Sequence, residues 1–230
     1  MNRVRPRLIA ITGGSGSGKS WLAEHLQELL GQAERLSLDA FYLDRSHLSA
    51  KRRARINYDH PRCIDWPLAV HVFQQLKAGR PVSVPHYDFA THSRIAGSSA
   101  LPPSPIFLVE GLWLLRRPAV RHLFDLSIFL DCPAQRRLGW RIARDTVERG
   151  RSAESVREQF CATVAPMHDL YVEPQARHAD LVLRQPLNGE SVERLVDRVW
   201  SLVTADAIYP DSKRVSLLDR AMKLMAREVV

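Results

Sequence analysis

The 230-residue sequence contains little cysteine and no long hydrophobic run. Its three cysteines, Cys63, Cys132 and Cys161, form no CxxC pair, which argues against a structural zinc site or a disulfide framework and is typical of a reducing compartment. No stretch approaches the roughly 20 apolar residues that span a bilayer. The apolar run at residues 8–11 is also too short for a signal peptide. We therefore expect a cytoplasmic protein without a membrane partner.

Lysine is scarce as well, so the positive charge rests on arginine. Only five of the 33 basic residues are lysines, while the formal net charge is +8. A basic balance can indicate nucleic-acid binding, but it is equally typical of a protein that handles polyphosphates. The densest basic patch, Lys51-Arg52-Arg53-Ala54-Arg55, has no interleaved aromatic residue. A solvated loop is the favoured interpretation of this patch, and nucleic acid is an unlikely partner.

The strongest motif is a glycine-rich segment near the start of the chain. It follows the apolar stretch at residues 8–11 and precedes a segment in which leucines recur at helical spacing. Strand, glycine-rich turn and helix in this order make Gly-x4-Gly-Lys-Ser a phosphate-binding loop. The candidate residues of the loop are Gly13, Gly14, Ser15, Gly16, Ser17, Gly18, Lys19 and Ser20.

The chemistry of this loop predicts binding of a nucleoside triphosphate. Glycines let several backbone N–H groups converge on one anion, and the helix that follows adds its positive end. Lys19 can reach the outer phosphates, and the Ser20 hydroxyl can bind Mg²⁺. Both ATP and GTP remain possible phosphate donors.

Two later apolar stretches end in a carboxylate, which indicates a parallel sheet with an acidic edge. A strand predicted at residues 35–38 leads into Asp39, and a strand predicted at 106–111 carries Glu110. Ligands of open parallel sheets bind at the carboxyl ends of the strands. Either acid can therefore hold Mg²⁺ or meet a substrate hydroxyl. An aspartate that only starts a turn is the alternative for Asp39.

The remaining pattern predicts a hairpin and a set of helices around further strands. Residues 81–94 alternate as a strand whose two prolines restrict it to an edge or a hairpin arm, and residues 96–105 are expected to form a loop. Strands are also expected at 126–131 and 179–183, with a helix interrupted by Pro166 and Pro174 between them. Arg137, Arg141 and Arg144 share one helix face, which suits either a lid over phosphates or a solvated helix.

Several segments together resemble the uridine kinases (uridine–cytidine kinases) of the phosphoribulokinase/uridine kinase family. The resemblance extends over roughly residues 7–185 in unbroken order. Its most specific parts are Asn57-Tyr58-Asp59-His60-Pro61 and Tyr87-Asp88-Phe89-Ala90-Thr91-His92-Ser93-Arg94. The segments Leu38-Asp39-Ala40-Phe41-Tyr42, Glu148-Arg149-Gly150-Arg151 and Pro166-Met167-His168 also match.

This resemblance implies a nucleoside kinase of pyrimidine salvage, in which each half of the site has its own residues. It implies that Asp39 is the base for the nucleoside 5′-hydroxyl, that Lys19 and Arg144 attend the phosphates, and that Ser20, Asp39 and Glu110 surround Mg²⁺. It further implies that the nucleoside is bound by Tyr58, Asp59, Tyr87, His92, Arg141, Arg151 and Gln159.

We therefore expect an α/β fold of the P-loop NTPase type, with a parallel five-stranded sheet flanked by helices, a small β-hairpin and a helical lid. Residues 1–205 are expected to form the kinase domain, with the hairpin at about 81–105 and the lid at about 133–175, and residues 206–230 a helical tail. A homo-oligomer is possible. The nearest alternative is a related kinase of another small alcohol, such as nicotinamide riboside, pantothenate or a sugar phosphate. A regulatory nucleotide switch is disfavoured because no Asn-Lys-x-Asp motif occurs.

Overall fold

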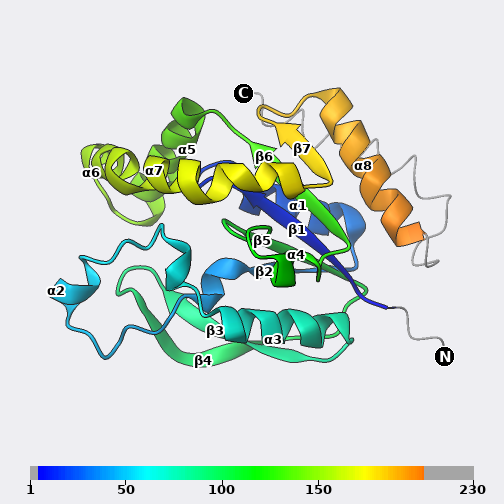
Figure 1. Ribbon diagram of the computed structural model, residues 1–230, viewed down its shortest axis with the longest axis horizontal. Helices are drawn as coiled ribbons and strands as arrows, with labels where there is room; N and C mark the ends of the chain where they lie inside the picture. The colour runs from blue at the N-terminus through cyan, green and yellow to red at the C-terminus, as the bar shows by residue number, and fades with distance from the viewer. Residues whose placement is uncertain (1–4, 205–230) are drawn as a thin grey trace.

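The computed structural model describes residues 5–204 (Figure 1). The tail expected at residues 206–230 lies outside the described residues. None of the described helices is both long and apolar enough to cross a membrane.

A five-stranded parallel sheet forms the centre of the molecule and confirms the predicted fold class. The strand order is β2-β5-β1-β6-β7. The strands are β1 (Arg7–Gly13), β2 (Ala33–Ser37), β5 (Ile106–Gly111), β6 (Leu126–Asp131) and β7 (Leu181–Arg184). Because helices cover both faces of a parallel sheet, its central strand is continuously apolar over Leu8-Ile9-Ala10-Ile11, which is fully buried.

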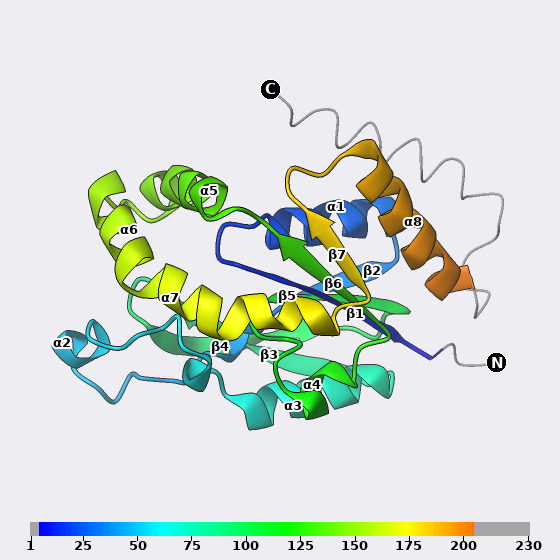
Figure 2. The ribbon, with the colours of Figure 1, turned by 45° about the horizontal axis from the view of Figure 1, so that its top comes forward.

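Two helical layers cover the faces of this sheet (Figures 1 and 2). Helices α1 (Lys19–Leu30) and α8 (Gly189–Thr204) pack on one face, where Leu26, Leu195 and Trp200 join one apolar cluster. Helices α3 (Trp66–Lys77) and α4 (Pro118–Arg121) pack on the other face, in a cluster that contains Phe73 and Trp113. The two layers fix the strand ends from both sides.

The register of the sheet determines where the predicted acidic residues lie. Ser37 of β2 pairs with Glu110 of β5, and Thr12 of β1 pairs with Gly111. The strand expected to run into Asp39 ends at Ser37, and Asp39 lies in a short 3-10 helix, Leu38–Phe41, which the Ser37 side chain caps. Glycine at 111 allows this turn to approach, since a Cβ there would come within 2.5 Å of the Leu38 Cβ.

The predicted hairpin is longer than expected on its second arm. Strands β3 (Val82–Asp88) and β4 (Ser93–Leu101) pair antiparallel, so the loop expected from residue 96 begins only after Leu101. Small hydroxyl side chains bond across the arms, with Ser83 Oγ donating to Ser98 Oγ at 2.5 Å. A register shift after Pro85 accommodates the proline that argued against a regular strand.

The segment that follows β6 is helical over the residues where a lid is expected, and we refer to this segment as the lid. It contains α5 (Ala134–Glu148), α6 (Ala153–Gln159) and α7 (Ala165–Met167), followed by a 3-10 helix at Glu173–His178. The predicted interruption at Pro166 is present as a change of helix type and not as a break in the chain's helical course. π-helical turns at Phe160–Val164 and His168–Val172 flank the short α7, and the proline stands in the first turn of α7. A proline in a first turn removes no hydrogen bond that the helix needs. The short α2 (Ala50–Arg53) and a 3-10 turn at Pro61–Cys63 complete the described elements.

Candidate functional site

A large open cleft lies across the carboxyl ends of the strands. Its volume is about 1880 Å³, and it runs between the glycine-rich loop, the hairpin and the lid. It brings together most of the predicted site residues: Ser15, Gly16, Gly18, Lys19, Ser20, Asp39, Tyr58, Asp59, Tyr87, His92, Glu110, Arg141, Arg144, Arg151 and Gln159 all line it. The predicted loop residues Gly13, Gly14 and Ser17 are buried and lie outside the lining.

The glycine-rich loop wraps the start of α1 as the motif predicts. Gly16 and Gly18 adopt positive φ angles of 76° and 86°. A Cβ on Gly16 would collide with the backbone carbonyl of Arg137, so the loop and α5 approach through glycine alone. The Lys19 ammonium donates to the Gly14 carbonyl at 2.8 Å, and burial lowers the pKa of this lysine. The loop is thus a compact, positively charged cradle for phosphate.

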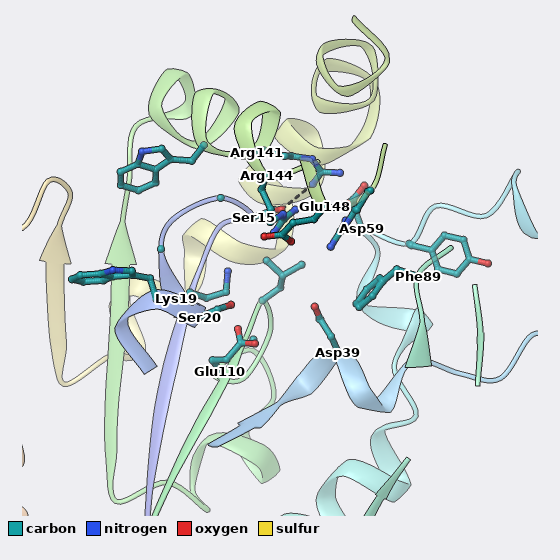
Figure 3. A pocket seen from close by; sticks show the side chains of 18 of the residues that line it. Ser15, Lys19, Ser20, Asp39, Asp59, Phe89, Glu110, Arg141, Arg144 and Glu148 are labelled. Atoms are coloured by element: carbon teal, nitrogen blue, oxygen red, sulfur yellow. Dashed lines mark hydrogen bonds between the residues drawn. The ribbon is translucent and has the colours of Figure 1, made fainter. Parts of the chain in front are cut away.

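Two carboxylates and a hydroxyl face the cleft beside this loop. Figure 3 shows Ser20 and Glu110 next to Lys19, with Asp39 across from them. Burial and the nearby charge of Glu110 raise the pKa of Asp39 to about 6. A divalent cation would relieve this repulsion, and hard oxygen donors are what Mg²⁺ prefers. The donor set therefore fits Mg²⁺.

Another group of potential ligand atoms belongs to the lid, on His168, Asp169 and Glu173. Both of its carboxylates are exposed, and none of the three residues lines the large cleft.

The hairpin side of the cleft is aromatic. The rings of Tyr58 and His92 are stacked, with centroids 4.0 Å apart and an interplanar angle of 8°. Tyr87 stacks on Tyr42 at 4.9 Å. The hydroxyls of Tyr58 and Tyr87 and the Nδ1 atom of His92 are buried without a hydrogen-bond partner. Because unpaired buried polar groups are costly, this side of the cleft is suited to a planar ligand with polar edges.

His92 stands at the hairpin turn in a left-handed conformation, with a φ of 52°. A non-glycine residue rarely adopts this conformation, and such outliers cluster at functional sites. Burial lowers the pKa of His92, with a further contribution from the Arg149 charge. The imidazole therefore stays neutral at pH 7 and keeps both a donor and an acceptor nitrogen.

Polar side chains connect the two sides of the cleft. Arg141 donates to Ser15 Oγ of the loop at 2.8 Å and to the Gln159 side chain at 2.9 Å. Arg151 donates to the same Gln159 oxygen. Asp59 accepts a hydrogen bond from Thr163 at 2.8 Å. The predicted nucleoside residues on the lid are therefore already bonded to one another and to the loop.

Sequence reasoning gave no individual role to several residues around the cleft. Arg149 lies over the Phe89 ring at 4.9 Å and so joins the lid to the hairpin. Asp145 on α5 is fully buried among arginines. It lies four residues after Arg141, and this spacing on a helix predicts an ion pair, so the sequence did contain a signal for it. The far end of the cleft, beyond Gly18, is lined by Trp21, Arg136, Trp140, Gln185, Pro186 and Leu187. These last residues come from three places in the chain, α1, α5 and the segment after β7; within α5, Arg136 and Trp140 are four residues apart and in contact.

Comparisons with known proteins agree with this geometry. Residues 8–189 match the model of the Phosphoribulokinase / Uridine kinase family. A uridine kinase of Staphylococcus epidermidis is 36% identical over 200 residues, covering 86% of this chain and 97% of that protein. A uridine kinase of Chloroflexus aurantiacus is 39% identical over 207 residues, covering 87% and 97%. Among solved structures, a putative fructose transport system kinase from Silicibacter sp. TM1040 superposes with a TM-score of 0.64 at 25% identity, over 79% of this chain and 91% of that chain.

Proposed function

The chain belongs to the phosphoribulokinase/uridine kinase family, and from this premise we propose that it transfers the γ-phosphate of a nucleoside triphosphate to the 5′-hydroxyl of uridine or cytidine. The products are a nucleoside diphosphate and a nucleoside 5′-monophosphate. The observation that carries the proposal is one cleft that joins a phosphate cradle to an aromatic pocket with three unpaired polar atoms.

The loop and the far end of the cleft bind the donor, either ATP or GTP. Backbone N–H groups of the loop, the Lys19 ammonium and the Arg144 guanidinium hold the phosphates. The donor base lies beyond Gly18, where the ring of Trp140 offers a stacking surface. Stacking distinguishes purines poorly, so this end of the cleft accepts either donor.

The hairpin and the lid bind the acceptor. Tyr87 and His92 contact the pyrimidine, and Tyr58 supports the His92 ring from behind. Asp59 accepts hydrogen bonds from the ribose hydroxyls, because a vicinal diol offers two donors to one carboxylate. Gln159, Arg141 and Arg151 complete the ribose side through their shared hydrogen bonds.

Ser20, Asp39 and Glu110 are the residues that would hold Mg²⁺. When bound, the ion neutralises charge on the phosphate oxygens and orients them for transfer.

Asp39 is the base in this proposal. As the bond between the 5′-oxygen and the γ-phosphorus forms, the bond to the β-phosphate oxygen breaks and the hydroxyl proton passes to the Asp39 carboxylate. The transition state of such a transfer is loose, so the proton is needed late and a weak base suffices.

Two of the other small alcohols considered for this family, pantothenate and a sugar phosphate, do not explain the aromatic pocket. Neither offers an aromatic face to Tyr58, Tyr87 and His92, which line the cleft beside Asp59. Nicotinamide riboside does carry an aromatic ring, so the screen must separate it from uridine and cytidine.

The test is a screen of the purified full-length chain for release of nucleoside diphosphate, with ATP or GTP and Mg²⁺, over nucleosides and small alcohols. We expect uridine or cytidine to give the highest kcat/KM. Hydrolysis without an acceptor should be slow, because the lid arginines close over the phosphates only when both substrates are bound. Preference for pantothenate, a sugar phosphate or nicotinamide riboside contradicts the proposed acceptor. Hydrolysis at the same rate without any acceptor contradicts the kinase assignment and favours a nucleotide switch.

A further inference from the structure

One aspartate on the lid is surrounded by arginines. Asp145 is 0% exposed, and its Oδ1 atom lies 2.8 Å from Nη2 of Arg144 and 3.6 Å from Nη1 of Arg149. Its Oδ2 atom lies 3.5 Å from Nε of Arg141 and 3.6 Å from Nη1 of Arg151. The Asp145 backbone carbonyl also accepts from the N–H groups of Arg149 and Arg151, so it closes the turn after α5.

The arginines face the cleft and the aspartate does not. Arg141, Arg144, Arg149 and Arg151 all line the cleft, whereas Asp145 lies behind them. Four guanidinium groups this close repel one another, and water cannot screen the repulsion well because Arg141 is almost fully buried. The buried Asp145 carboxylate lies within 3.6 Å of all four side chains and offsets this repulsion.

The cluster also links the two halves of the cleft. Arg141 bonds both Ser15 of the loop and Gln159, and Gln159 bonds Arg151 in turn. The Thr163 hydroxyl lies between the Gln159 backbone carbonyl, at 3.1 Å, and the Asp59 carboxylate, at 2.8 Å, and shares its one proton between these two acceptors. A ligand that orders Arg141 at the loop therefore also orders the side chains that face the acceptor, and a second ligand then loses less conformational freedom on binding.

We propose that Asp145 is a positioning residue of the transfer reaction. Its carboxylate holds the lid arginines over the phosphate cradle and thereby couples binding of the donor to binding of the acceptor. This inference rests on the proposed function, in that it takes a nucleoside as the acceptor.

Charge and position predict opposite effects when this carboxylate is removed. Asp145→Asn adds one positive charge to the phosphate side of the cleft, so charge alone predicts tighter binding of a polyphosphate. Loss of the Asp145 contacts predicts weaker binding, because the four arginines are then no longer held over the phosphate cradle. The sign of the change therefore separates the two roles.

The experiment compares Asp145→Asn with the matched control Asp125→Asn in the full chain. Asp125 also forms ion pairs with two basic residues, Arg7 and Lys77, but lies outside the cleft. Calorimetry measures the Kd of a non-hydrolysable ATP analogue with Mg²⁺, and the Kd of uridine with and without that analogue. Steady-state kinetics with ATP and uridine gives kcat and each KM.

We expect the analogue to improve uridine binding about fivefold or more in the unaltered protein, and in Asp125→Asn to the same extent. In Asp145→Asn this factor should fall to about one, the analogue should bind more weakly, and kcat should fall about tenfold to hundredfold. Unchanged coupling in Asp145→Asn, or tighter analogue binding with unchanged kcat, overturns the proposal. A factor of one in the unaltered protein also overturns it.

A second variant covers the case in which Asp145→Asn does not fold because the arginines repel. Asp145→Asn combined with Arg149→Gln restores the net charge of the cluster, since it removes one cation and one anion. We expect this double variant to fold and to remain uncoupled, because Arg144 and Arg141 still lack their partner. Full recovery of coupling would mean that charge balance is the whole role of Asp145, and the proposal would be wrong.

Failure of the proposed function looks different. If the unaltered chain binds the analogue but neither binds nor phosphorylates a pyrimidine nucleoside, the acceptor assignment fails. The role of Asp145 over the phosphates is then decided by analogue binding alone, in Asp145→Asn against Asp125→Asn.

Discussion

The phosphate-binding loop and the aromatic pocket lie in the same cleft, but they differ in what holds their polar groups in place. The loop is held by backbone geometry: it joins β1 to α1, and Gly16 packs directly on the Arg137 carbonyl. The pocket is held by side chains from the hairpin, the loop around Tyr58 and the lid, which contact one another. The first arrangement is anchored in the sheet, and the second depends on segments far apart in the sequence.

Because of this difference, single substitutions in the two regions should affect different kinetic constants. Side chains at the strand ends can be changed without moving the loop backbone, so their effects should appear in the chemistry or in Mg²⁺·NTP binding. Side chains of the pocket are each part of the surface that meets the acceptor, so their effects should appear in the KM for the nucleoside.

The largest effect is expected for Asp39→Asn. The amide keeps the size of the side chain but cannot accept the hydroxyl proton, and removal of a positioned general base lowers kcat by about two to four decades. Nucleoside binding, measured by calorimetry, should stay within a few-fold. Asp44→Asn is the matched control, since Asp44 is a nearby aspartate that bonds only Ser46 and the Arg94 backbone outside the cleft. If Asp39→Asn retains more than about a tenth of kcat, the base is another residue.

Glu110→Gln should act on the metal and the donor and leave the acceptor unaffected. A bond to a charged group contributes about 1.5–3 kcal/mol, so the KM for Mg²⁺·NTP should rise by about one to two decades. Extra Mg²⁺ should restore part of the activity, and the KM for the nucleoside should not change. A rise in the nucleoside KM alone would place Glu110 on the acceptor side and would break the comparison between the two halves.

His92→Ala should show the reverse pattern. Loss of a hydrogen bond to a buried polar group costs about 1–3 kcal/mol, so the nucleoside KM should rise by about one to two decades while the KM for NTP stays constant. Because His92 has a positive φ, His92→Asn is a useful companion that tolerates this backbone conformation. His86→Ala on the same hairpin is the control, since His86 bonds Ser99 outside the cleft. An unchanged nucleoside KM in folded His92→Ala would remove His92 from the site.

The same difference explains how much the sequence could predict. The loop and the strand ends follow from local patterns: an apolar run, a glycine turn and a carboxylate at the end of a strand. The five-stranded sheet and the placement of Lys19, Ser20 and Glu110 in one cleft were predictable for this reason. The pocket residues were found through the resemblance to a family, because nothing local distinguishes Tyr58 or Gln159 from an ordinary polar residue.

What the sequence could not predict depends on contacts between distant segments. The second hairpin arm is rich in small polar residues and has no apolar alternation, and it is a strand because its backbone pairs with that of β3, as Ser83 does with Ala100. Pro166 suggested a helix break, but π-helical turns on both sides carry the chain through it. Asp145 is a buried charge whose partners lie partly beyond α5, at Arg149 and Arg151.

The smallest effect is expected where the two regions touch, at His168. This lid histidine lies against the loop, since a Cβ on Gly14 would come within 2.8 Å of its Nδ1 atom. Burial, with the charges of Arg137 and Lys19, lowers the pKa of His168 to about 4. The unfolded chain takes up the proton near pH 6.5, so between about pH 6.5 and 4 the unfolded state binds more protons than the folded state. Stability contributed by His168 is therefore lost as the pH falls through this window.

Asp39 acts in the opposite direction, because its folded pKa of about 6 lies above its unfolded value. The folded state then takes up a proton first, and stability is gained as the pH falls below about 6. The two contributions to the pH dependence of stability therefore partly cancel. The contribution of His168 can be measured only as a difference between the unaltered chain and a variant that lacks this histidine. Denaturant unfolding measures the free energy of unfolding of the unaltered chain and of His168→Gln at pH 7 and at pH 5. From pH 7 to pH 5, the difference in this free energy between the two proteins should shift by about 1 kcal/mol in favour of the variant. This figure allows for the partial exposure of His168. His71→Gln, on the exposed face of α3, should show no such shift. If His168→Gln shows none either, the lid does not bury this imidazole against the loop in solution, and the two regions are less tightly joined than the structure has them.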